Sequence, residues 1–266
     1  MKEQPFSNAP NSRFYFDTDE HGEAMARIFH AIETNKGLVV MIGDSGTGKT
    51  LLGRRILERL EEKGGFESGL LVIIHTEVTA EWMLRKIATQ MGVASVKESK
   101  GEIISQVFER LMEIHEQGKK AVVLIDEANM LQKKEIYEEF RGLLNLEIPG
   151  QKLVNIVLLG MPELEEYMKQ DPPLVQRVAL KFRLKNLGEE STRKYIQHRL
   201  RVAGAEGPIF NEDALHTIYR WSSGFPRLIN TVCDNALLEG YLRKKRFLEK
   251  VDIDEVGEGL GLRPVS

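Results

Sequence analysis

"GLVVMIGDSGTGKT", residues 37–50, joins an apolar run to a glycine-rich turn, and a helical pattern follows at once. Residues 37–43 are apolar almost without interruption, which is typical of a strand buried on both faces of a parallel sheet. Residues 43–50 match G-x-x-x-x-G-K-[ST] without a mismatch, between a predicted strand and a predicted helix. The stretch therefore predicts a phosphate-binding loop in an α/β fold. A glycine-rich turn without a chemical role is the weaker alternative.

Each part of this loop has a physical role in holding a nucleoside triphosphate. Gly43, Gly46 and Gly48 let backbone N–H groups turn inward, where the positive end of the next helix also points. The Lys49 ammonium would reach the β- and γ-phosphates, and the Thr50 hydroxyl would hold Mg²⁺. The predicted nucleotide-binding residues of the loop are Gly43, Asp44, Ser45, Gly46, Thr47, Gly48, Lys49, Thr50 and Leu51.

The same alternation of apolar runs and helical patterns continues through the first 187 residues. Further strands are predicted at 69–76, 120–127, 154–160 and 179–184. Helices are predicted at 19–35, 49–62, 79–91, 101–117, 133–147 and 172–178. Helical connections of this length are what parallel strands need, so we expect a five-stranded parallel sheet between helices.

Strand patterns stop at Gly188. The remaining helical patterns lie at 189–203, 211–222, 226–243 and 250–258. We therefore expect two domains, an α/β domain over residues 1–187 that includes a leader at 1–18, and a small all-α domain over residues 188–266.

"AVVLIDEAN", residues 121–129, delivers two carboxylates to the end of a predicted buried strand. Charged groups there are costly unless a cation or water engages them. Asp126 is predicted to bind Mg²⁺, directly or through its water shell, and Glu127 to orient and deprotonate the attacking water. A pair of surface carboxylates is the alternative, and the phosphate-binding loop one crossover away favours the site.

Three arginines are candidates for stabilising the charge of a transferring phosphoryl group. Arg177 ends a predicted short helix and could project into a neighbouring subunit as an arginine finger, although a solvated helix-end cation is the alternative. Arg183, within the last predicted strand, is interpreted as ion-paired. Arg227 follows Pro226 at the start of a helix, where the macrodipole disfavours a cation. It either lies in water or reaches for an anion elsewhere.

The composition limits the class of protein. Lys and Arg number 37 against 40 Asp and Glu, which gives no global positive charge that would mark a nucleic-acid coat. The basic run at 243–246 suits the end of a helix, and DNA binding is its alternative reading. Cys233 is predicted to be a buried apolar residue in a reducing compartment. No apolar run is long enough to span a membrane, and the six histidines have no zinc-ligand spacing.

In their order along the chain, these motifs resemble AAA+ ATPases, and specifically the general secretion pathway protein A type, also called ExeA-like. The resemblance extends from about Pro5 to the last helix. Besides the phosphate-binding loop, it is carried by "PFSNAPNSRFYF" (5–16), "EHGEAMARIFHAI" (20–32), "LIDEA" (124–128), "VLLGMPEL" (157–164), "LVQRVALKFRLKNL" (174–187) and "GFPRLIN" (224–230).

The resemblance implies ATP and Mg²⁺ as cofactors, a nucleotide-binding base at 1–187 and a helical lid at 188–266. It implies a homo-oligomer, a ring or filament that is hexamer-like, in which Arg177 acts on the neighbour's nucleotide. Pro226 and Arg227 then lie at the nucleotide, with Arg227 as the family's second sensor. The implied catalytic residues are Lys49, Glu127, Arg177 and Arg227.

The chain departs from the family pattern at two positions. Met161 stands where the family usually has glutamine as a polar first sensor, and Asn129 stands where glutamine usually follows "DEA". Because a methionine cannot orient a water, we expect slow hydrolysis without loss of nucleotide binding.

The leading hypothesis is an ATP-driven motor or switch in envelope assembly, such as type II secretion or a related pilus or export system. Better-known members of the family continue into a transmembrane helix and a peptidoglycan-binding domain, whereas this sequence stops after the ATPase region. We therefore expect a cytoplasmic chain, or one held at the inner membrane by a membrane-anchored partner, with a truncated or shorter member of the family as the alternative. One alternative is a DNA-binding ATPase of the transposition-regulator type. Another is a nucleotide-dependent scaffold with little turnover.

Overall fold

The computed structural model describes residues 1–9 and 11–264, and its contacts divide the chain into two units. The sheet unit comprises residues 20–43 and 52–184. The helical unit comprises the leader up to residue 19, the phosphate-binding loop at 44–51 and the described residues from Lys185 onward. The contacts therefore group the leader with the C-terminal helices, whereas the sequence led us to assign it to the α/β domain.

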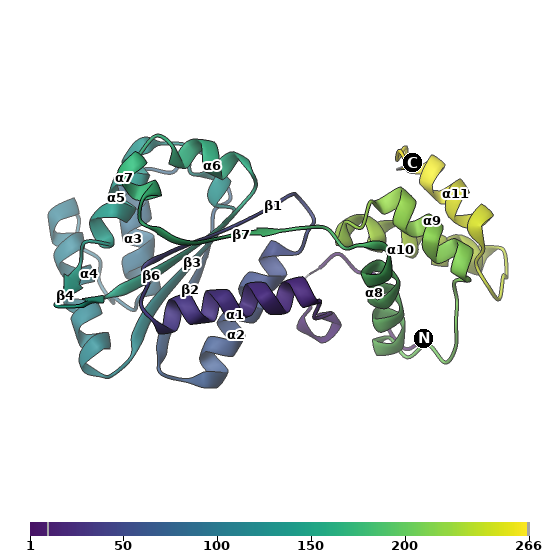
Figure 1. Ribbon diagram of the computed structural model, residues 1–266, viewed down its shortest axis with the longest axis horizontal. Helices are drawn as coiled ribbons and strands as arrows, with labels where there is room; N and C mark the ends of the chain where they lie inside the picture. The colour runs from purple at the N-terminus through teal and green to yellow at the C-terminus, as the bar shows by residue number, and fades with distance from the viewer. Residues whose placement is uncertain (10, 265–266) are drawn as a thin grey trace. The chain divides into compact units, whose positions relative to one another are not determined.

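The sheet unit contains the predicted five-stranded parallel sheet, in the order β2-β3-β6-β1-β7 (Figure 1). Its strands are β1 (Leu38–Gly43), β2 (Phe66–Val72), β3 (Lys120–Asp126), β6 (Val154–Gly160) and β7 (Val178–Leu184). Residues of β1 and β6 are buried throughout, as the continuous apolar runs predicted. The edge strand β7 alternates between exposed and half-buried residues up to its last position.

Helices cover both faces of this sheet (Figure 1). On one face, α1 (Asp19–Glu33) and α2 (Lys49–Lys63) pack apolar side chains against Val39, Met41 and neighbouring strand residues. On the other face lie α3 (Ala80–Gln90), α4 (Lys100–Glu116), α5 (Lys134–Leu143), α6 (Glu163–Met168) and α7 (Pro172–Val175). This two-sided packing holds the carboxyl ends of the strands in a fixed row.

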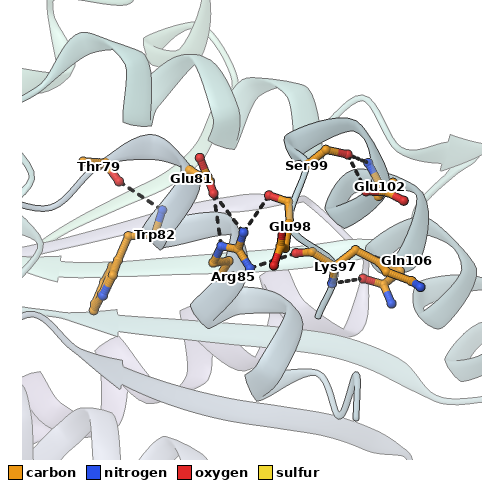
Figure 2. A network of polar contacts seen from close by, with 9 residues as sticks. All are labelled: Thr79, Glu81, Trp82, Arg85, Lys97, Glu98, Ser99, Glu102 and Gln106. Atoms are coloured by element: carbon orange, nitrogen blue, oxygen red, sulfur yellow. Dashed lines mark hydrogen bonds and ion pairs between the residues drawn. The ribbon is translucent and has the colours of Figure 1, made fainter. Parts of the chain in front are cut away.

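The helix pair α3 and α4 is tied together through the loop between them (Figure 2). Arg85 of α3 donates to the backbone carbonyls of Lys97 at 2.8 Å and Glu98 at 2.6 Å, and pairs with Glu81 at 2.9 Å. From α4, Gln106 accepts the Lys97 N–H at 2.9 Å. The loop is therefore held by side chains from both helices that flank it.

Three details of the sheet unit differ from the sequence prediction. The second strand was expected at 69–76, but β2 covers Phe66–Val72. The helix expected at 133–147 ends at Leu143, and a short hairpin, β4 (Glu147–Ile148) with β5 (Gln151–Lys152), follows it. The helix expected at 172–178 ends at Val175, and α6 was not predicted.

The helical unit forms a separate apolar core from η1 (Ser12–Phe14), α8 (Glu189–Val202), α9 (Glu212–Ser222), α10 (Pro226–Leu242) and α11 (Lys250–Gly259). Cys233 lies in this core with no exposed surface, and its burial raises the pKa of the thiol well above the usual value. The predicted role as a buried apolar residue fits this position. None of the helices described in the chain combines the length and apolar character that a membrane span requires.

The leader is part of this helical core. Phe6 is 1% exposed and makes an edge-on contact with Phe210. Arg199 of α8 is also buried and donates to the backbone carbonyls of Pro5 at 2.5 Å and Ser7 at 3.1 Å. These contacts join segments about 190 residues apart in the sequence and explain why the leader belongs to the helical unit.

Candidate functional site: the phosphate-binding loop and the ends of the parallel strands

The phosphate-binding loop follows β1 and leads into α2, as the sequence predicted. Gly46 and Gly48 have φ angles of +83° and +100°, a conformation that glycine adopts without strain. The Asp44 carbonyl accepts hydrogen bonds from Thr47 Oγ1 and from Lys49 Nζ, each at 2.9 Å. The loop thus curls around the Lys49 side chain, and Thr50 lies half-buried in the first turn of α2.

The N-terminus of α10 lies against this loop within the helical unit. The Arg227 N–H faces the Gly46 carbonyl at 3.4 Å, and a Cβ built on Gly46 would lie 3.0 Å from the Arg227 Cβ. The Arg227 side chain is exposed and makes no hydrogen bond or ion pair with any residue that the structure describes. A cation without a partner in the described chain therefore lies beside the loop that is predicted to bind phosphate.

The turn that begins α10 also holds the chain segment after β7. Gly224 has a φ of +73°, and a Cβ built there would lie 1.8 Å from the Leu187 carbonyl oxygen. The Leu187 N–H donates to the Gly224 carbonyl at 2.9 Å, and the Asn186 side chain donates to the Ser223 carbonyl. Glycine is required at residue 224 for this contact, which lies within the helical unit. No role for Gly224 was predicted from the sequence.

Asp126 ends β3 as a buried carboxylate, 1% exposed. Its Oδ1 accepts the Glu127 N–H at 2.9 Å, whereas its Oδ2 is buried and has no partner in the described part of the chain. An oxygen atom in that state costs free energy unless a ligand satisfies it. Carboxylate oxygens are preferred ligands of Mg²⁺, so Asp126 fits the predicted metal-binding role.

Glu127 adopts a left-handed backbone conformation with φ of +54° and ψ of 36°. This region is uncommon for residues other than glycine, and such strain concentrates at functional sites. The Glu127 side chain is partly exposed, and its carboxylate accepts no hydrogen bond from the residues described. A carboxylate held on a strained turn and not engaged by a cation suits a general base.

The sheet register brings the ends of β1, β6 and β3 next to one another. Ile42 of β1 pairs with Gly160 of β6, and Leu158 of β6 pairs with Ile125 of β3. The phosphate-binding loop leaves β1 directly after Ile42, and the two acidic residues close β3. In open parallel sheets, ligands bind outside the carboxyl ends of the strands, so this edge is where a nucleotide is expected.

The loops after β3 and β6 are joined by one buried amide. Asn129 lies in η2 (Ala128–Met130), is 5% exposed, and accepts the Met161 N–H through Oδ1 at 3.0 Å. Met161 itself presents a partly exposed, apolar side chain at the end of β6. Both departures from the family pattern therefore meet at one point of the candidate site.

Arg177 lies between α7 and β7 and is partly buried. Its Nη1 donates to the Arg141 carbonyl at 3.2 Å and to the Asn145 side chain, both near the C-terminal end of α5. Neither acceptor carries a formal charge. The two hydrogen bonds therefore position the guanidinium, and no described carboxylate forms an ion pair with it. Whether it reaches a neighbouring subunit stays a prediction.

Arg183 is ion-paired, as the sequence analysis expected. It contacts Glu165 at 2.7 Å, and Lys181 contacts the same carboxylate at 2.6 Å. The hydrogen bond from Lys181, with help from Arg183, lowers the pKa of Glu165 below its ordinary value. This cluster belongs to the exposed side of β7 and takes no part in the candidate site.

Two residues of the basic run after α10 form ion pairs within the helical unit. Arg243 pairs with Glu255, and Lys245 pairs with Asp252 at 2.6 Å. The two charges engaged in this way stabilise the packing of α11 and leave a smaller cationic surface than the sequence suggested.

A family model described as an AAA domain matches residues 32–168. The chain belongs to this AAA family. The match covers β1, the phosphate-binding loop, β3 and β6, which are the elements of the candidate site.

The chain is also similar to the general secretion pathway protein A of Aeromonas hydrophila. The two are 33% identical over 256 residues, which cover 95% of this chain and 46% of that relative. The resemblance noted in the sequence is therefore confirmed, and the chain spans less than half the length of the relative that it matches.

Solved structures with the same fold include Cdc6 and ORC proteins and a Holliday junction branch migration motor. The Cdc6p protein of Pyrobaculum aerophilum matches with a TM-score of 0.75 and 16% identity, over 98% of this chain and 72% of that chain. The ORC2 protein of Aeropyrum pernix matches at 0.69 and 13%, over 94% and 72%. The RuvB branch migration motor of Thermotoga maritima matches at 0.59 and 16%, over 94% and 74%. These likenesses confirm the predicted fold, an α/β P-loop architecture followed by C-terminal helices.

Proposed function

We propose that this chain binds and hydrolyses Mg·ATP and works as an oligomeric motor or switch in assembling envelope machinery, such as type II secretion or a related pilus or export system. The observation that carries the ATPase proposal is the pair at the end of β3, where, among the residues that the structure describes, neither Asp126 Oδ2 nor the Glu127 carboxylate has a partner and Oδ2 is buried. The next strand of the sheet after β3 and β6 is β1, and it leads directly into a complete phosphate-binding loop.

In this proposal the chain's own groups divide the work. The loop N–H groups and Lys49 bind the phosphates, Thr50 and Asp126 hold the metal ion, and Glu127 orients a water and takes its proton. Mg²⁺ supplies neutralisation of the phosphate charge. Phosphoryl transfer needs little beyond such positioning and charge stabilisation, which fits a site built from strand ends. Met161 offers no polar group to the water, so we propose slow turnover.

Arg227 is proposed as the group that reports the γ-phosphate to the helical unit. Its side chain has no partner among the described residues to give up, and its backbone already lies beside Gly46. Contact with a phosphate oxygen would reverse the unfavourable effect of a cation at the start of α10. The Gly224–Leu187 contact would then pass a movement of α10 to the segment after β7.

Arg177 is proposed as an arginine finger in a homo-oligomer. Its bonds to Arg141 and Asn145 position the guanidinium and use only uncharged acceptors. Mixing Arg177→Ala with Lys49→Ala protein is expected to restore turnover, since an intact finger from a Lys49→Ala subunit would act on the intact nucleotide site of an Arg177→Ala subunit. The measurement is phosphate release as a function of mixing ratio. A mixture no more active than either variant alone would argue against action in trans.

The envelope role rests on the similarity to general secretion pathway protein A. We propose a membrane-anchored protein partner, which would hold the chain at the inner membrane. Inner-membrane vesicles from the source cell are expected to raise the rate of ATP turnover several-fold, and protease-treated vesicles are not. Equal stimulation by the treated vesicles would contradict a protein partner.

A DNA-binding ATPase remains the second candidate, because Lys244 and Arg246 of the basic run form no ion pair with the residues described. The envelope proposal predicts that duplex DNA leaves the turnover rate unchanged. Stimulation by DNA that weakens steeply with salt would favour the second candidate instead.

A further inference from the structure

The amide of Asn129 has one hydrogen-bonding group engaged and one available. Its Oδ1 accepts the Met161 N–H at 3.0 Å, and a backbone N–H can only donate, so the oxygen must face Met161. The Nδ2 group therefore points away from that bond. It donates to none of the residues that the structure describes.

This NH₂ group is in reach of solvent although the residue is 95% buried. Asn129 is 5% exposed, and the fully buried side-chain atoms without a partner in the described chain are Asp126 Oδ2, Thr192 Oγ1 and His198 Nε2. Asn129 Nδ2 is not among them, so part of its surface is accessible to solvent. A buried amide whose donor is left over calls for a ligand or a water.

The position of Asn129 is set by the two strands that carry the candidate site. It follows Asp126 and Glu127 by one short turn, and its bond to Met161 fixes it beside the end of β6. Gly160, the residue before Met161, pairs with Ile42, after which the phosphate-binding loop begins. The donor is therefore anchored between the acidic pair and the strand that delivers the loop.

We propose that Asn129 supplies the polar donor that Met161 lacks, and that its NH₂ group orients the attacking water or a γ-phosphate oxygen during hydrolysis. The inference rests on the proposed ATPase function and names a residue for that reaction. It also explains how a chain with a methionine at the first-sensor position keeps a hydrogen-bond donor at this edge of the sheet.

The first test is Asn129→Ala, with ATP affinity and turnover measured separately. Loss of one oriented donor in an active site typically lowers kcat by about 100-fold. We expect a loss of that order with an ATP dissociation constant within about threefold of wild type. Turnover equal to wild type would overturn the proposal.

The second test separates donation from the structural bond to Met161. In Asn129→Ala/Met161→Gln, a glutamine amide returns to the first-sensor position, and at least about tenfold of the lost kcat should be recovered. Recovered turnover would show that a side-chain amide acts in the chemistry, because the hydrogen bond from the backbone N–H of residue 161 to residue 129 is still missing in the double variant. Failure to recover any turnover would overturn the proposal in favour of a purely structural role.

A matched control is Asn155→Ala. Asn155 is another buried asparagine, 2% exposed, in the first half of β6, where it accepts the Gly37 N–H at 3.3 Å. It should lower the unfolding temperature and leave kcat near wild type at a temperature where the protein is folded. If Asn155→Ala lowered kcat as much as Asn129→Ala, the effect would be general destabilisation and the proposal would fail.

Glu127→Gln in the same assay distinguishes failure of the proposed ATPase function from failure of the Asn129 inference alone. If Glu127→Gln and wild type turn over ATP equally, the proposed function fails, and with it the role of Asn129. If Glu127→Gln is inactive and Asn129→Ala is fully active, the ATPase proposal stands and only the Asn129 inference fails.

Discussion

Glu127→Gln is expected to bind Mg·ATP about as well as wild type and to hydrolyse it at least about 100 times more slowly. The substitution keeps the size and polarity of the side chain and removes its capacity to accept a proton. The Glu127 carboxylate makes no hydrogen bond to a described residue, so its loss should break nothing in the fold. The measurement is retention of labelled ATP by the variant after rapid gel filtration.

The matched control for this variant is Glu163→Gln. Glu163 is an exposed glutamate in the first turn of α6, after the end of β6, and we give it no role in the chemistry. It should hydrolyse ATP like wild type. An equal loss of turnover in the two variants would show that the effect is one of local charge and not of proton transfer from water.

Arg227→Ala is expected to lower the discrimination between ATP and ADP while leaving the fold intact. A charge-assisted hydrogen bond contributes about 1.5–3 kcal/mol, which corresponds to roughly 10- to 150-fold in affinity. Because the side chain is exposed and has no described partner, the free energy of unfolding should change by about 0.5 kcal/mol or less. Calorimetric titration with a non-hydrolysable ATP analogue and with ADP measures the ratio.

Arg246→Ala is the control for this second prediction. Arg246 is another exposed arginine of the helical unit, where it lies over the ring of Phe247, away from the start of α10. Its removal should leave both dissociation constants unchanged. If Arg227→Ala also kept the wild-type ratio of affinities, Arg227 would not be a γ-phosphate sensor.

The phosphate-binding loop and the acidic pair could be predicted from sequence because the determinants are local. Residues 37–50 contain the strand, the glycines and the lysine in one uninterrupted segment, and the left-handed Gly46 and Gly48 follow from the motif. In the same way, the apolar run of β3 specified both the burial of Asp126 and its place at a strand end. Short-range patterns of this kind leave little for tertiary structure to decide.

The boundaries of β2 show where local pattern fails. Ile73 and Ile74 favoured a strand that continued to residue 76, but β2 is an edge strand whose register with β3 ends at the pair of Val72 and Asp126. The less apolar residues at the start of β2 belong to the strand because Phe66 pairs with Lys120 of β3. The partner strand, and not the hydrophobicity of the segment, determined the ends of the element.

The roles of the leader, Gly224 and Asn129 depend on contacts between distant segments. Arg199 binds leader carbonyls, Gly224 accepts a bond from Leu187, and Asn129 binds the backbone of Met161. A single sequence contains no signal for such pairs, although the asparagine after "DEA" marked one of the positions as a departure from the family pattern. The sequence supplied the candidate residues, and the three-dimensional contacts were needed to relate them.

Whether the acidic pair at the end of β3 serves ATP hydrolysis can be decided by one comparison of rates. Phosphate release from saturating Mg·ATP should be measured for wild type and Glu127→Gln under identical conditions. We expect a saturable rate for wild type that falls at least about 100-fold in the variant. Equal rates in the two proteins, or no phosphate release by wild type, would contradict it.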